Sequence, residues 1–258
     1  MTVHPALRHV VRRVWCSPDR GHRGLERVIP SGGAHMVWRV GGRIEVDGVH
    51  GQAGVLAGPR FTSHARRAGP GTSVGVELLP GAIPLLFGTS SRAVAGLHVD
   101  LGDVWGRRAE RVQGALEEGD LGAVEAALLE VLREGPVREG LPLALGALER
   151  GLPVEAAAMR AGCTARTLGA WFHDDVGLAP VRWARVRRVR HAMDLADEAE
   201  DGAHLAALVG FADHAHLCRD FRAVAGSTLT HWRAGRRPEA VAHVAASDSF
   251  KREGRGAR

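Results

Sequence analysis

The spacing of apolar residues changes twice along the chain. Residues 1–100 hold short apolar bursts between Gly and Pro turns, and the segment 34–48 (AHMVWRVGGRIEVDG) alternates around a Gly-Gly pair as a β-hairpin does. Over residues 107–134, Ala, Leu and Glu dominate, and apolar residues recur at helical spacing. From Leu141 onward, one short helix follows another, each ended by glycine. The pattern therefore predicts a β-rich N-terminal part and an all-helical C-terminal part.

These changes predict an α+β protein of two domains, with boundaries where the composition shifts. We expect a β-rich domain over residues 1–105, a helical connector over 106–140 and an all-α domain over 141–235. The segment 135–142 (GPVREGLP) is a linker broken by Gly and Pro. Residues 236–258 are polar and aperiodic, and we expect them to form a disordered basic tail.

Within the helical part, residues 154–177 have the pattern of two helices joined by a tight turn. Gly162 supplies the bend, and Thr164 is placed to cap the helix that follows. The apolar stripe of that helix repeats every four residues, at Leu168, Phe172 and Val176. Two helices joined by so short a turn, with a small residue at the bend, form a helix-turn-helix unit.

A second unit of the same design occupies residues 203–226. Gly210 lies at its bend, and Asp213 is placed as the cap. The apolar stripe of its second helix consists of Leu217, Phe221 and Val224. The segment between the units, residues 179–199, can form one long helix rich in arginine. The C-terminal domain is therefore predicted to hold two helix-turn-helix units joined by a long helix.

The side chains opposite each apolar stripe are the candidates for contact with a partner. In the second unit they are His214, Ala215, Cys218, Arg219 and Arg222. In the first unit they are Thr164, Ala165, Arg166, Thr167, Ala170 and His173. A helix fits the major groove of DNA, where arginine binds phosphate or guanine and alanine can touch a thymine methyl group. By residue type, Arg219 and Arg222 are strong readers of DNA in the second unit, and only Arg166 is in the first.

The residues of the second unit also suggest two other kinds of chemistry, metal binding and thiol redox sensing. His214, His216 and Cys218 suggest zinc, but residues two apart on a helix point to different sides and cannot converge on one ion. Cys218 is also a candidate redox-sensing thiol, since Arg219 and Arg222 could activate it. We expect no metal here.

The chain lacks the signatures of common enzymes. It has no P-loop, dinucleotide fingerprint or Ser-His-Asp signature. His35, His50 and His64 fall in the β-rich part, yet the His-x-His pair and following carboxylate of metal-binding cupins are missing. We therefore expect no catalytic site, no cofactor and no metal, and the sequence identifies no ligand-binding residues.

Composition and charge permit a DNA-binding protein. The net charge is +5 and the pI is about 10.2, a mildly basic balance that suits nucleic acid as a partner. Cys16, Cys163 and Cys218 form no CxxC pair, which fits a reducing cytosol. No apolar run reaches the length of a signal peptide core or the ~18 residues of a membrane span. We expect a cytoplasmic protein without membrane contact.

The doubled helix-turn-helix resembles the DNA-binding domain of AraC/XylS-type transcription regulators. The resemblance covers about residues 141–233 and is most specific in GFADHAHLCRDFRAVAG (210–226) followed by STLTHWR (227–233). The matching residues are Gly210, Phe211, Asp213, His216, Leu217, Arg219, Phe221, Gly226 and Trp232. The resemblance implies that His216 packs or caps inside the domain. The segments 28–40 and 75–106 are similar to the β-rich, cupin-like sensory domain often found ahead of AraC-type helices.

This resemblance implies a sequence-specific DNA-binding transcription regulator. Its two recognition helices would occupy successive major grooves, about 34 Å apart, so a monomer can fill an asymmetric site. The expected partners are double-stranded DNA, RNA polymerase, a small-molecule effector at the N-terminal domain and a second copy in a homodimer. The alternative is a cupin-like small-molecule binding or catalytic protein whose helical domain serves only assembly.

Overall fold

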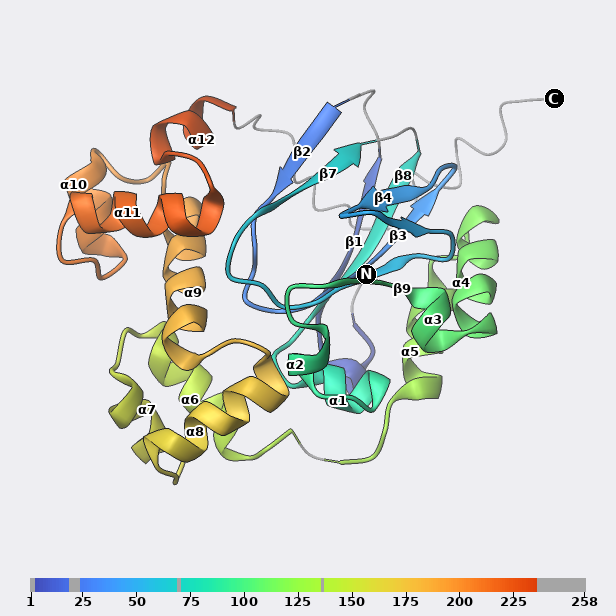
Figure 1. The fold of residues 1–258 in the computed structure, drawn as a ribbon, viewed down its shortest axis with the longest axis horizontal. Coiled ribbons are helices and arrows are strands. Elements are labelled where there is room, and N and C mark those ends of the chain that lie inside the picture. The colour runs from blue at the N-terminus through green and yellow to red at the C-terminus, as the bar shows by residue number, and fades with distance from the viewer. Residues whose placement is uncertain (1–2, 19–23, 69–70, 136, 236–258) are drawn as a thin grey trace.

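The computed structural model describes residues 3–18, 24–68, 71–135 and 137–235. A β-rich N-terminal domain is followed by helices, and the last seven of these lie along one side of that domain (Figure 1). This arrangement confirms the predicted α+β fold of two domains, with a helical domain at the C-terminal end. The predicted tail, residues 236–258, lies outside the described residues.

Strands of the N-terminal domain form two sheets. The five-stranded sheet has the order β1 (Val11–Pro18), β8 (Thr72–Leu78), β3 (His35–Val40), β6 (Val55–Ala57) and β9 (His98–Asp100). The four-stranded sheet has the order β2 (Gly24–Val28), β7 (His64–Ala68), β4 (Ile44–Val46) and β5 (Val49–Gly51). Neighbouring strands pair antiparallel in both sheets. Buried side chains such as Met36, Trp38, Leu56 and Val76 fill the core, and a short 3-10 helix, η1 (Pro5–Leu7), precedes β1.

The hairpin predicted over residues 34–48 is wrong in its partner strands. The Gly-Gly pair after Val40 leads from β3 to β4, which belong to different sheets. The hairpin of this segment joins β4 to β5 instead, with Val46 opposite Val49. Its turn residues, Asp47 and Gly48, both have positive φ (48° and 77°), which is the geometry of a two-residue type I′ turn. The Asp-Gly pair was therefore the turn signal, and the Gly-Gly pair marks a change of sheet.

The helices after β8 complete the core of the β-rich domain. They are α1 (Ala82–Phe87), α2 (Ser91–Val94), α3 (Leu101–Trp105), α4 (Arg107–Glu117) and α5 (Gly122–Val131). Val112 and Leu116 of α4 and Leu128 of α5 are buried in the same cluster as Trp38 of the sheet. The segment predicted as a connector thus packs mainly on the N-terminal domain.

Seven helices follow within the described residues. They are α6 (Gly140–Glu149), α7 (Val154–Arg160), α8 (Ala165–Trp171), α9 (Pro180–Asp194), α10 (Gly202–Leu208), α11 (His214–Ala225) and α12 (Leu229–Gly235), and a π-helical turn (Phe172–Val176) extends α8. Helices α6 to α8 share one hydrophobic core and α10 to α12 another, and α9 contributes to both. Among the described helices, none has the length and apolar character needed to cross a bilayer.

Both helix-turn-helix units begin their second helix as the sequence predicts. Gly162 (φ 71°) and Gly210 (φ 75°) occupy the left-handed region that a glycine bend requires. The Thr164 hydroxyl accepts a hydrogen bond from Thr167 N–H at 3.1 Å, and Asp213 accepts one from His216 N–H at 2.6 Å. These local signals place α8 and α11 after the turn, which is the position of a recognition helix.

Candidate nucleic-acid interface

The outward face of α11 is open to solvent. Leu217, Phe221 and Val224 are fully buried against α9 and the neighbouring helices. The predicted contact residues point the other way: His214, Ala215, Arg219 and Arg222 are exposed, and Cys218 is half-buried. The Cys218 sulfur lies 3.3 Å from His214 Nε2, one helical turn earlier. All five predicted side chains are thus brought together on one accessible face.

His216 lies apart from that face, on the side of the domain core. Its ring meets Phe211 edge-on with centroids 5.1 Å apart, and its Nε2 is 3.8 Å from Asp220 Oδ2. This is the packing role expected for His216. No group of three or more His, Cys, Asp or Glu side chains that could hold a metal ion occurs in the described part of the chain.

A buried ion pair fixes α11 to the long helix α9. Arg185 donates from Nη2 and Nε to Asp220 Oδ1, at 2.6 and 3.1 Å. Asp220 is buried, so its charge needs this partner. Sequence reasoning missed this pairing, because Asp220 lies between two stripe positions and nothing in the spacing shows that a carboxylate there turns inward.

The other arginines of α9 are also occupied within the chain. Arg187 Nε donates to Glu149 at 2.8 Å, and the Arg188 guanidinium lies 5.1 Å from the centre of the Phe211 ring. The Arg190 side chain is half-buried, and this burial lowers the pKa of its guanidinium. The basic run that the sequence presents along α9 therefore serves largely to hold the helices together.

The first recognition helix, α8, carries a weaker version of the same face. Arg166 and His173 are exposed, and Ala165 is half-buried. The Thr164 and Thr167 hydroxyls lie 2.9 Å apart and bind each other at the start of the helix. Arg166, Ala170 and His173 are therefore exposed on α8 and its π-helical turn, with Arg166 as the cation among the candidates. The predicted outward place of Ala165 is wrong, because this side chain packs against the hydrophobic core of the first unit.

Two family models match the chain, one in each half. A model described as a helix-turn-helix domain matches residues 157–235, and a model described as a domain of unknown function (DUF6597) matches residues 2–100. No curated protein matches the chain. The helix-turn-helix match begins within α7 and includes both recognition helices.

Among solved structures, the chain is similar to ToxT from Vibrio cholerae. The ToxT structure from strain O395 is 9% identical, with 87% of this chain and 97% of that chain covered and a TM-score of 0.47. A P21 crystal form of ToxT is 10% identical, covering 85% and 96% at a TM-score of 0.47. ToxT of strain SCE256 with bound unsaturated fatty acid is 10% identical, covering 86% and 93% at 0.46.

The family match and the geometry agree on the C-terminal domain. The matched region contains two bends at glycine, two capped recognition helices and an open outer face on α11. These are the parts that a helix-turn-helix domain uses to enter the major groove. The C-terminal domain is therefore a helix-turn-helix domain of the AraC type, and the chain that carries it is a DNA-binding transcription regulator.

Proposed function

We propose that this regulator binds one asymmetric DNA site as a monomer, with α8 and α11 in successive major grooves. The observation that carries the proposal is that both recognition helices present an exposed face and are joined by one continuous helix. Helix α9 has 15 residues, which corresponds to a length of about 22 Å. Helix α8 precedes α9 in the chain and α11 packs on α9, so one rigid element links both recognition helices, as the reading of two grooves about 34 Å apart requires.

The side chains on α11 carry most of the proposed sequence reading. Arg219 and Arg222 can bind guanine O6 and N7 or a phosphate, and His214 can donate or accept a hydrogen bond at a base edge. Ala215 can contact a thymine methyl group. On α8, Arg166 is the matching cation, whereas the Thr164 hydroxyl caps the start of the helix by accepting a hydrogen bond from Thr167 N–H. The second unit therefore supplies more of the specificity than the first.

The N-terminal domain is proposed to carry the regulatory input. A small-molecule effector bound there would change DNA affinity or contact with RNA polymerase through the domain contacts described below. The proposed role is regulatory and needs no catalytic chemistry, and its DNA target lies in the cytoplasm. A homodimer is compatible with this role, although two recognition helices in one chain do not require it.

Selection of bound duplexes from a random pool, using the full chain, tests the proposal. We expect enrichment of a bipartite site whose halves are about 10 bp apart. The logarithm of the affinity should fall linearly with the logarithm of the salt concentration, because phosphate contacts release counterions. Arg111→Ala removes one positive charge at an exposed position on α4, away from both recognition helices. It is the matched control for variants that remove an arginine from α8 or α11. Failure to enrich any sequence would contradict the proposed function.

A further inference from the structure

The end of the second recognition helix is docked on the N-terminal domain. A helix leaves its last carbonyl groups without partners of their own. At the end of α11, Ser63 N–H donates to Val224 O at 2.8 Å, and the Ser63 hydroxyl donates to Ala225 O at 2.9 Å. Arg27 Nη1 donates to the same hydroxyl at 3.2 Å. A residue of the β-rich domain thus caps the helix that is proposed to read DNA.

The first recognition helix ends on the same domain in the same way. Asp175 O, in the π-helical turn after α8, accepts hydrogen bonds from Gly81 N–H at 2.9 Å and from the Ser91 hydroxyl at 2.7 Å. The chain then turns at Gly177, which has a φ of 77°. A Cβ at that position would lie 2.9 Å from Ser91 O, so the close approach of the two segments requires glycine.

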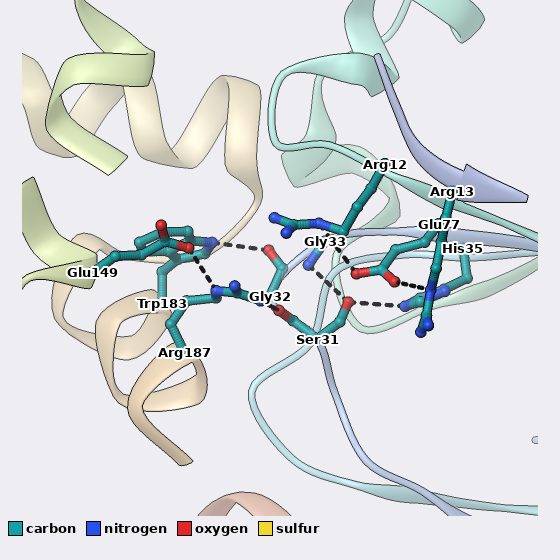
Figure 2. A network of polar contacts seen from close by, with 10 residues as sticks. All are labelled: Arg12, Arg13, Ser31, Gly32, Gly33, His35, Glu77, Glu149, Trp183 and Arg187. Atoms are coloured by element: carbon teal, nitrogen blue, oxygen red, sulfur yellow. Dashed lines mark hydrogen bonds and ion pairs between the residues drawn. The ribbon is translucent and has the colours of Figure 1, made fainter. Parts of the chain in front are cut away.

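The N-terminal half of α9, the helix between the two units, is held by the β-rich domain, and Figure 2 shows the contacts. The indole Nε1 of Trp183, a fully buried side chain, donates to Gly32 O at 3.0 Å. Arg187 Nη1 donates to Ser31 O at 3.0 Å, while its Nε binds Glu149 of α6. A loop of the β-rich domain therefore binds α9 through two backbone carbonyls.

That loop is itself fixed inside the β-rich domain. The Ser31 hydroxyl is 2.8 Å from His35 Nε2 and accepts a hydrogen bond from Gly33 N–H at 3.2 Å. Beside it, the buried Glu77 carboxylate binds Arg13 at 2.8 Å (Figure 2). The contacts to α9 thus come from a braced surface and not from a free loop.

Phe61 joins the two units directly. Its ring packs against the hydrophobic cores of both helix-turn-helix units. The guanidinium carbons of Arg182 and Arg185 on α9 lie 5.5 and 5.1 Å from its ring centre. Since Arg185 also holds Asp220 of α11, a shift of Phe61 would be felt at the second recognition helix.

We infer that Phe61, Ser63 and the backbone of Ser31–Gly33 are positioning residues for DNA recognition. By holding α9 and the end of α11, while Gly81 and Ser91 hold the end of α8, they set the distance and angle between α8 and α11. The N-terminal domain thereby determines which separation of half-sites the protein accepts. This inference rests on the proposed function for its DNA consequence, while the positioning itself is a property of the protein alone.

Two hydrophobic cores joined by one helix explain why such positioning is needed. Each unit has its own core, and α9 is shared between them. Two linked binding modules gain affinity only when their geometry matches the two sites at once. Small rotations of one unit about α9 would give α8 and α11 many different separations. Contacts from the β-rich domain to both units and to α9 restrict the two helices to one separation.

The first measurement is made without DNA. Spin labels attached at the exposed positions Ala170 and Ala223 through a non-natural ketone side chain report the separation of the two recognition helices in the full chain. We expect one narrow distance distribution in the otherwise unchanged protein and a broader or shifted one in Phe61→Ala and Ser63→Ala. An unchanged distribution in both variants would overturn the inference, whatever the protein binds.

Matched variants separate positioning from loss of stability. Thr62→Ala changes an exposed neighbour of Ser63. Phe87→Ala removes a ring that stacks on Trp105 inside the β-rich domain, 5.6 Å between centroids, without touching either helix-turn-helix core. We expect both to keep the narrow distribution. Broadening in Phe87→Ala equal to that in Phe61→Ala would assign the effect to general loosening and overturn the inference.

The second measurement varies the DNA. For the full chain, moving the half-sites of the selected duplex by half a helical turn, about 5 bp, should weaken binding about ten-fold or more. In Phe61→Ala and Ser63→Ala this penalty should shrink to about three-fold or less, with binding to a single half-site unchanged. A uniform loss at every spacing, or tighter binding at every spacing, would overturn the inference. Absence of DNA binding by the unaltered chain would instead refute the proposed function, and the label distances would still decide the positioning.

Discussion

The two helix-turn-helix units share one design but differ in what holds and equips their recognition helices. Helix α11 is tied to α9 by the buried Arg185–Asp220 pair, and it presents two exposed arginines, Arg219 and Arg222. Helix α8 presents Arg166 as its one predicted cationic contact, contains Gly169 and runs into a π-helical turn. We therefore propose that the second unit contacts bases and that the first holds the duplex in place.

This difference shows how a doubled unit can divide its work. Two identical readers in one chain would demand a long, fully specified site. A strong reader and a weak one need only one well-defined half-site together with backbone contacts at the other. This division of work can be tested first at the Arg185–Asp220 ion pair of the second unit.

Asp220→Ala should give the largest effect on stability. The change leaves Arg185 without the carboxylate that accepts two of its hydrogen bonds, in a region where α9 and α11 pack closely. Loss of one partner of a buried pair costs about 3 kcal/mol, and the partial exposure of Arg185 reduces this to about 2 kcal/mol. Chemical denaturation of the full chain measures the change.

The matched change in the first unit is Asp174→Ala. Asp174 is exposed in the π-helical turn, and exposed substitutions usually change the free energy of unfolding by less than about 0.5 kcal/mol. Equal losses in the two variants would show that the ion pair does not distinguish the units.

Arg219→Ala and Arg166→Ala compare the readers themselves. If Arg219 binds a base, its loss should weaken binding to the selected site about 5- to 150-fold, corresponding to roughly 1–3 kcal/mol. If Arg166 contacts phosphate, its loss should weaken binding to all sequences alike and reduce the salt slope by about 1. Fluorescence anisotropy with the selected duplex and a scrambled duplex over a salt series distinguishes the two patterns. A sequence-specific loss for Arg166→Ala together with a uniform loss for Arg219→Ala would show that the first unit, and not the second, reads bases.

The sequence predicted the helical half well because its signals are local. Glycine bends, a Thr and an Asp cap and apolar stripes at helical spacing each depend on a few neighbouring residues, and the structure contains all of them. Exposure of Arg219 and Arg222 follows from the same periodicity. The DNA-binding roles of these side chains remain predictions.

The sequence could not show which distant segments meet. The Gly-Gly pair after Val40 has the local pattern of a hairpin, yet the two strands around it pair in different sheets. Ser63 and Phe61 have no distinctive pattern at all, because their role depends on helices more than a hundred residues later. The arginines of α9 read as a basic surface until Glu149 and Asp220 are brought beside them.

Gly169→Ala tests whether the glycine inside α8 lowers the stability of this helix. An added Cβ at Gly169 would have no atom outside the helix within 4 Å, so the substitution changes helix propensity without a clash. We expect a gain of about 0.5–1 kcal/mol in the free energy of unfolding. Gly114→Ala in α4, an equally open helical position, should give a similar gain in the β-rich domain. A loss of stability in the first variant alone would mean that α8 needs glycine for its packing.

The smallest effect concerns acid pH, where the two units should respond in opposite directions. Burial raises the pKa of Asp175 in the first unit, although the Arg138 ion pair lowers it. In the second unit, the backbone N–H of His204 lowers the pKa of Asp201, the cap of α10. A raised pKa means that the native state binds more protons than the unfolded state just above pH 3.8, so stability from Asp175 decreases as the pH rises through that window. A lowered pKa means that stability from Asp201 is present above pH 3.8 and is lost as the pH falls further.

Asp175→Asn and Asp201→Asn isolate these two contributions. Asparagine keeps the size of each side chain and still caps a helix, so chiefly the titrating charge is removed. Unfolding free energies measured between pH 3 and 6 should show that Asp175→Asn gains stability relative to the unaltered chain as the pH rises. Asp201→Asn should lose relative stability over the same rise, because it lacks the charge that the backbone N–H favours. Parallel curves for both variants would mean that the two units do not differ in how they hold a carboxylate, and the contrast between them would then rest on their arginines alone.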